Sequence, residues 1–212
     1  ISEDRINKTL IQEASKMNKL YIVYHLLTKE NKIKEKLFYD IKTLKEIVIP
    51  PSVKSIERCA FYDCKSLARI SIPSTIKTIE SHAFCGCTSL IDVEIPTSVI
   101  SIGKYSFDRC SQLKSINLPS TITKIEQYCF YGCKSLSHII IPSSIRTIES
   151  HAFYGCSSIT KIDIPTSIIF IGQSSFKECS NLTRINFDTP FSIQTISKSA
   201  FKLCLLLTEI SI

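Results

Sequence analysis

The sequence predicts a repeat solenoid built of short parallel β-strands, and periodic features carry that prediction. Phenylalanine recurs every 23 residues, cysteine follows it three residues later, and Leu or Ile follows it after six. Units this short cannot bury their own apolar faces, so they stack on their neighbours around one continuous core. The phenylalanines are Phe61, Phe84, Phe107, Phe130, Phe153 and Phe176, and a stretched last unit has Phe201 and Cys204.

The first side of each coil is predicted to be a short strand with one buried face. The unit that begins at Leu67 reads Leu-x-x-Ile-x-Ile-Pro, and its closing alternation is that of a half-buried strand. Proline ends the strand because it has no N–H for a further ladder bond. Counting such units gives eight strands, the last at 207–212.

The other two sides are shorter. An apolar pair such as Ile76 and Ile79 predicts a second short strand, and 81–87 predicts a tight turn or a single helical turn. The pair after the proline is Ser or Thr, as in Ser74-Thr75, so we expect its hydroxyls to bond turn backbone of the neighbouring coil. All five glycines fall at two corners, where we expect positive φ. They are Gly86, Gly132 and Gly155 before the cysteine, and Gly103 and Gly172 after the second apolar pair.

The first 43 residues depart from the pattern and predict a cap. Residues 2–18 place Ile6, Leu10, Ile11, Ala14 and Met17 at helical spacing, which predicts an amphipathic helix over the open end of the solenoid. Beyond it, Tyr21, Tyr24 and Leu26 fit the strand columns without the proline, and indicate one degenerate coil. The chain therefore divides into 1–43, a helical cap with a degenerate coil, and 44–212, a solenoid of about seven regular coils plus a final strand.

The unit Leu-x-x-Ile-x-Ile-Pro-x-Ser/Thr-Ile-x-x-Ile-Glu/Gly-x-x-Ala-Phe-x-x-Cys resembles the BspA-like leucine-rich repeat, over residues 44–212. The resemblance implies a right-handed, curved solenoid whose strands line the concave face. It also implies a role in protein binding, which includes surface attachment in bacterial members. The two-residue insertion around 188–193 and the segment 1–43 depart from the family pattern.

Ten cysteines raise the question of disulfides or metal. Stacked column members are one coil rise apart, longer than the roughly 3.8 Å Cβ separation of a disulfide, and no C-x₂-C pair offers a zinc site. We expect buried free thiols, with Cys85-Gly-Cys87 left open as a local redox pair, and no cofactor or metal. Cys59, Cys85 and Cys129 lie outside the column without obvious mates and favour a reducing compartment, cytoplasmic or peripheral at the plasma membrane, over secretion.

The sequence gives little support for catalysis, membrane insertion or nucleic-acid binding. The sequence has no Ser-His-Asp order, H-E-x-x-H, Walker loop or G-x-G-x-x-G, so we expect no enzyme. With 26 Lys and Arg against 19 Asp and Glu, the net charge is +7, but the two signs are interspersed, which is typical of a solvated surface. No run of 18 apolar residues predicts a transmembrane segment. Basic strand positions lack interleaved aromatic residues, so no nucleic acid is expected.

The outward strand positions do not repeat, and they are the predicted binding surface. Asp92 and Glu94 form an acidic patch, Ile91 and Ile140 are candidate apolar anchors, and a basic stripe runs over the later strands. The full set is Arg69, Ile91, Asp92, Glu94, Lys114, His138, Ile140, Lys161, Asp163 and Arg184. We therefore predict a non-enzymatic module that binds a protein partner on its concave strand face, either as an intracellular scaffold or regulator or as a surface adhesin.

The alternative is a structural protein that forms a homodimer through an uncapped C-terminal coil. An exposed parallel edge with apolar neighbours is a template for pairing, and sedimentation that finds only monomer at high concentration would contradict it. The residues proposed for this contact are Ile169, Phe170, Phe191, Leu203, Leu205, Leu206 and Ile212.

Overall fold

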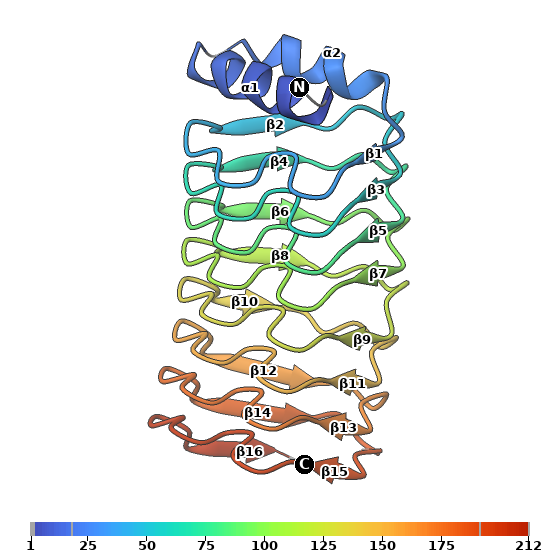
Figure 1. Cartoon of the computed structure of the whole chain (residues 1–212). Helices are drawn as coiled ribbons and strands as arrows, with labels where there is room; N and C mark the ends of the chain where they lie inside the picture. The colour runs from blue at the N-terminus through green and yellow to red at the C-terminus, as the bar shows by residue number, and fades with distance from the viewer. Residues whose placement is uncertain (1–2, 18, 191, 212) are drawn as a thin grey trace.

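The computed structural model describes residues 3–17, 19–190 and 192–211. Its coils stack in chain order, from two N-terminal helices at one end to the C-terminus at the other (Figure 1). Each coil contributes one strand to each of two rows and a turn on the third side. This is the parallel-strand solenoid of 23-residue coils that the sequence predicts, and the expected eight strands of the first row are confirmed.

The first row consists of the even-numbered strands. They form three separate parallel ladders, in which neighbouring strands pair with a shift of one repeat, so that Ile47 lies opposite Ile70 and Val93 opposite Ile116. In the strands that contain Ile47, Val93 and Ile116, this middle residue is buried and its neighbours face out, whereas the last strand, which contains Ile210, is exposed at all three residues. The strands are β2 (Glu46–Val48), β4 (Arg69–Ser71), β6 (Asp92–Glu94), β8 (Ser115–Asn117), β10 (His138–Ile139), β12 (Lys161–Ile164), β14 (Arg184–Phe187) and β16 (Glu209–Ser211).

The second row consists of the odd-numbered strands, each of two residues. Parallel ladders connect the first four of them, β1 to β7 in chain order, into one sheet, and the last four, β9 to β15, into another. This row therefore forms two hydrogen-bonded blocks. The strands are β1 (Lys32–Ile33), β3 (Ser55–Ile56), β5 (Thr78–Ile79), β7 (Ser101–Ile102), β9 (Lys124–Ile125), β11 (Thr147–Ile148), β13 (Phe170–Ile171) and β15 (Thr195–Ile196).

The turn side carries two columns with positive φ, four residues apart. Gly86, Gly132 and Gly155 have φ between +67° and +76°, as predicted, but Gly103 and Gly172 do not, and that part of the expectation is wrong. The other positive-φ positions are Lys36, Cys59, His82, Tyr105, Tyr128, His151, Ser174 and Ser199 in the first column, and Asp40, Asp63, Arg109, Glu178 and Leu203 in the second.

Gly103 and Gly172 are needed for a different reason. A Cβ on Gly103 would lie 2.5 Å from the backbone nitrogen of Ser81 in the preceding coil, and one on Gly172 would lie 2.5 Å from that of Ser150. Real Cβ atoms do not approach backbone so closely. These glycines allow close approach of coils rather than a left-handed turn.

Phenylalanine and cysteine hold successive coils together in the core. The rings from Phe38 to Phe201 stack face to face, with centroids 4.7–5.6 Å apart. Each column thiol donates a hydrogen bond to the Phe carbonyl 26 or 28 residues earlier, as Cys87 Sγ does to the Phe61 oxygen at 3.1 Å. Burial raises the pKa of the Cys64 thiol to about 12 and that of Cys204 to about 11. The cysteines are therefore protonated structural donors.

The Ser and Thr hydroxyls that follow the prolines bond backbone carbonyls of the preceding coil, as predicted. Thr75 and Ser98 each donate to a carbonyl of the preceding coil at 2.7 Å, to Val53 and Ile76 respectively. Ser167 does the same at 2.6 Å. The Ser144 hydroxyl, in the same column, is buried without a partner.

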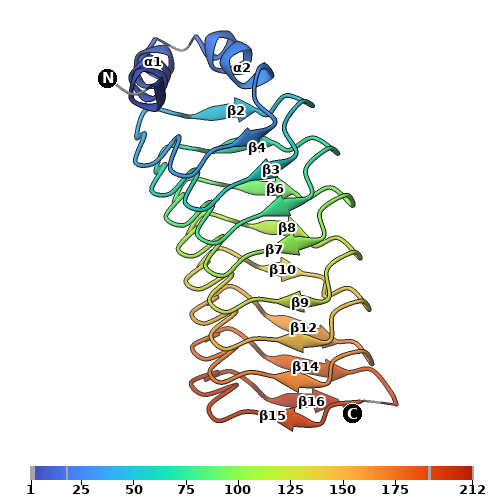
Figure 2. The ribbon, with the colours of Figure 1, turned by 45° about the vertical axis from the view of Figure 1, so that its right-hand side comes forward.

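The N-terminal cap contains two helices, α1 (Glu3–Lys16) and α2 (Leu20–Thr28), at the same end of the stack (Figure 2). Ile11 and Ala14 are buried as predicted, but Leu10 and Met17 are exposed, and the Ile6 side chain lies outside the described residues. The strand expected at Tyr21–Leu26 is wrong, because these residues belong to α2. This helix contacts β2 at the edge of the first row.

The regular pattern resumes at β1, since Phe38 stacks on Phe61. The division of the chain at residues 43 and 44 stays a prediction.

A second aromatic ladder runs along the turn side. His82, Tyr105, Tyr128 and His151 stack with centroids 4.6 Å apart, so the two histidines are packing residues. Burial lowers the pKa of both histidines below the ordinary 6.5. Their Nδ1 atoms are buried without a hydrogen-bond partner. Both rings are therefore best accommodated in the neutral form.

This ladder makes the stability of the fold depend on pH. Because the folded pKa of each histidine is lowered, the unfolded chain binds protons more tightly, and stability is lost as pH falls through 6.5 and below. Replacing both by tyrosine, the occupant of the two intervening positions, should make the urea midpoint less sensitive to pH between 7 and 5. An unchanged pH dependence in the double variant would contradict this assignment.

Candidate functional site

All ten side chains predicted for binding are exposed on the first row of strands. We call this surface the strand face: the outward side chains of β2 to β16 and the residues that flank each strand. Ile140 is 65% exposed and Ile91 is 37% exposed, so two large apolar side chains lie open on it. Their contribution to binding stays a prediction.

Half of the expected basic stripe, which consists of Lys114, His138, Lys161 and Arg184, is compensated within the chain. Lys161 Nζ lies 3.1 Å from Asp163 Oδ1, and Arg184 lies 2.6 Å from Glu209. On β4, Arg69 lies 3.4 Å from Glu46. Pairs this exposed add little to stability, but they reduce the local positive field. Within the described residues, Lys114 and His138 are the members of the stripe without an ion-pair partner.

The acidic patch, by contrast, is not compensated. Asp92 accepts a hydrogen bond of 2.8 Å from the Ser115 hydroxyl, which fixes its carboxylate on the surface. In the described part of the chain, neither Asp92 nor Glu94 forms an ion pair with a cation. The strand face therefore carries its open negative charge on β6.

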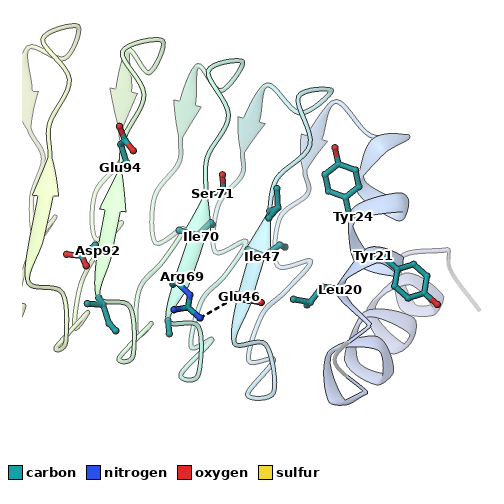
Figure 3. A pocket seen from close by; sticks show the side chains of 13 residues that line it. Leu20, Tyr21, Tyr24, Glu46, Ile47, Arg69, Ile70, Ser71, Asp92 and Glu94 are labelled. Atoms are coloured by element: carbon teal, nitrogen blue, oxygen red, sulfur yellow. Dashed lines mark hydrogen bonds and ion pairs between the residues drawn. The ribbon is translucent and has the colours of Figure 1, made fainter.

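A groove of about 870 Å³ lies between α2 and the first three strands of this face (Figure 3). Ile47 and Ile70 lie on its strand side, and Leu20 and Tyr24 of α2 lie on the other side, whereas the Tyr21 ring points away from the strands (Figure 3). Tyr24 is 39% exposed and Val48 is 58% exposed, so both sides of this hollow are open to a ligand. We call this hollow the cap groove.

The sequence does not predict the cap groove, because Tyr21, Tyr24 and Leu26 fit the columns of a strand. A helical signal was present: Val23 and Leu27, four residues apart, are both buried, and Leu20 packs beside them. With α2 in place of a first strand, Tyr24 stands over β2 instead of joining the sheet.

A second hollow of about 320 Å³ adjoins the cap groove over β6, β8 and β10. Ser115, Asn117, His138 and Ile140 are among its lining residues. Asp92 and Glu94 line both hollows. The acidic pair thus lies where the two hollows meet.

The described residues offer neither a cluster of metal ligands nor a paired, reactive thiol. Among the described residues, no three His, Cys, Asp or Glu side chains cluster as metal ligands. Cys85 is buried and donates a 3.4 Å hydrogen bond to Asp108 instead of pairing with Cys87. Burial raises the pKa of Cys85, which disfavours the reactive thiolate. Neither described helix has the length and apolar character needed to cross a bilayer.

The residues proposed for self-association fall into three groups. Leu203, Leu205 and Leu206 are exposed on the last coil, at 45–74%. Ile169 and Phe170 are half-buried, so they form a smaller patch than expected. Phe191 and Ile212 lie outside the described residues. Dimerisation through this end remains a proposal.

Comparisons with known proteins agree with the geometry. The model of the BspA type leucine rich repeat region matches in six copies over residues 31–131 and 101–212. The crystal structure of a leucine rich cell surface protein from Faecalibacterium prausnitzii A2-165 is 34% identical, with a TM-score of 0.69. The match covers 74% of this chain and 42% of that one, so the chain spans about two fifths of that protein.

The leucine rich repeat protein of T. pallidum is 27% identical, with a TM-score of 0.53 and coverage of 79% of this chain and 69% of that one. A comparison with curated proteins gave no match. Leucine-rich repeat proteins generally mediate protein interactions or adhesion, and this family is generally non-enzymatic. The periodic columns, the two strand rows and the family match together place the chain in the BspA-type leucine-rich repeat family.

Proposed function

We propose that this chain is a non-enzymatic binding module that holds a protein partner on its concave strand face. The observation that carries the proposal is the concentration of exposed, non-repeating side chains and two adjoining hollows on that face. The core columns repeat because they hold the stack, whereas the strand face varies from coil to coil. A surface of small polar groups with a few apolar anchors suits a protein ligand.

Two versions of this proposal differ in compartment. The relative described as a leucine rich cell surface protein supports an adhesin-like role. The ten unpaired cysteines support an intracellular scaffold or regulator, since a reducing compartment preserves thiols. Localisation of the full-length protein in its own cells separates the two versions. Self-association through Leu205 and its neighbours is the alternative, and it does not require the strand face.

A matched pair of substitutions tests the strand face. Ile140→Glu places a charge at an exposed anchor of this face, and Ile100→Glu makes the same change at a 61% exposed site beside β7, in the other strand row. We expect Ile140→Glu to reduce capture of partner proteins from the source cells at least tenfold, measured by quantitative mass spectrometry, because a hot-spot contact is lost.

Ile100→Glu should leave capture unchanged. Both variants should melt like the parent chain, since both sites are open to solvent. Equal capture by all three proteins would remove the strand face as the contact surface and leave the self-association model standing.

A further inference from the structure

The cap groove offers an apolar site with a net negative charge at its edge. Tyr24 and Val48 are 39% and 58% exposed along it, an open apolar surface next to the strand backbone. Its volume of about 870 Å³ lies within the range of specific ligand sites. Contiguous apolar surface of this kind, with a polar rim, is typical of an interaction site.

The charge of the groove is opposite to that of the chain. Its lining includes Glu46, Asp92 and Glu94 against Arg69, which is three negative charges and one positive, or −2. The whole chain carries +7. Arg69 is already paired with Glu46, so the open charge is that of Asp92 and Glu94. A ligand of this site should therefore bring positive charge.

The second hollow extends the site along the stack. The cap groove lies over β2, β4 and β6, and the second hollow lies over β6, β8 and β10. Their middle strands are two strand spacings apart, about 10 Å, which an extended peptide covers in about three residues. The acidic pair lies between the hollows, and Ile140 offers an apolar contact at the far one.

We propose that the cap groove and the adjoining hollow bind an extended peptide segment of a partner protein. The segment has a Lys or Arg over Asp92 and Glu94, and an apolar residue on each side of it. The residue toward the cap packs against Leu20 and Tyr24 of α2, and the other packs near Ile140. This inference rests on the proposed protein-binding role of the strand face and names the kind of segment that it recognises.

Selection from a random dodecapeptide display library on the intact chain tests this inference. We expect the enriched peptides to share a basic residue flanked by apolar ones. Synthetic copies should bind at least tenfold more weakly to the double variant Asp92→Asn with Glu94→Gln, and also to Tyr24→Gln, as measured by fluorescence anisotropy. Added NaCl should weaken binding to the parent chain, because exposed charges are screened.

The control variant carries Asp188→Asn with Glu13→Gln, the same two changes at exposed carboxylates outside both hollows, and should bind like the parent chain. Failure to enrich basic-apolar peptides, or equal binding to the Asp92 and Glu94 variant, overturns the inference. If Ile140→Glu still lowers partner capture in that case, the strand face remains the contact surface and only the peptide assignment fails. If Ile140→Glu leaves partner capture unchanged and the Asp92 and Glu94 variant leaves peptide binding unchanged, both proposals fail.

Discussion

Replacing Phe107 with alanine is expected to lower the free energy of unfolding by about 3–5 kcal/mol. Its side chain is fully buried, and its ring stacks on Phe84 and Phe130 with centroids 5.3 and 5.6 Å away. The substitution leaves a cavity between two coils and weakens two inter-coil contacts at once. In a solenoid, where stability is a sum of nearest-neighbour terms, such a loss in the middle cannot be made up elsewhere. Urea unfolding followed by circular dichroism measures it.

Phe201→Ala is the matched control for this prediction. Phe201 is only half-buried and has a single ring neighbour among the described residues, Phe176 at 5.3 Å. Its loss should cost no more than about 2 kcal/mol, because less apolar surface returns to water. The same cost at both positions would show that the stacked column is not the main link between coils.

Gly103→Ala should cost at least about 2 kcal/mol, although it adds only one methyl group. The new Cβ would meet three backbone atoms of Glu80 and Ser81 at 2.5–2.9 Å, and backbone cannot rotate aside as a side chain does. The coils must separate locally, which strains the hydrogen bond from the Gly103 N–H to the Ile79 oxygen at 2.8 Å. Thermal and urea unfolding of the variant both report the loss.

Gly155→Ala is the comparison that isolates the cause. Gly155 has φ +69°, but its nearest neighbour to a new Cβ is 3.9 Å away. Alanine there costs only the left-handed backbone, about 1 kcal/mol. A rule based on the repeat alone would predict that Gly103→Glu is harmless, since Glu80 and Glu126 occupy the same column. A Gly103→Ala variant no less stable than Gly155→Ala would contradict the close-approach explanation.

The periodic part of the fold could be predicted because one physical requirement recurs in every coil. A residue such as Phe61 must fill the same space against the same neighbours each time, so its identity is preserved at a fixed spacing. The same logic predicted the two strand rows and the buried free thiols. Stacking of identical units converts a sequence period directly into a position in space.

The second helix, the charge pairs and the cap groove could not be predicted, because they depend on contacts that do not repeat from coil to coil. Tyr21 and Tyr24 fit a strand column by spacing, but burial of Val23 and Leu27 made the segment a helix, an ambiguity inherent in short apolar runs. The partners of Lys161 and Arg184 could not be read from net charge, because pairing depends on side-chain geometry across coils. The cap groove follows from the helix, and so it was missed with it. These departures from the repeat are also where the candidate site lies.

The thiol of each column cysteine has a further use. Since its proton is held by a Phe carbonyl and burial raises its pKa, an alkylating reagent can attack only after the coil around it opens. The labelling rate at each position therefore reports the opening free energy of one segment of the stack. From Cys64 to Cys179, the native chain thus carries buried chemical probes 23 residues apart, from which mass spectrometry can map local stability along this part of the stack without any engineered label.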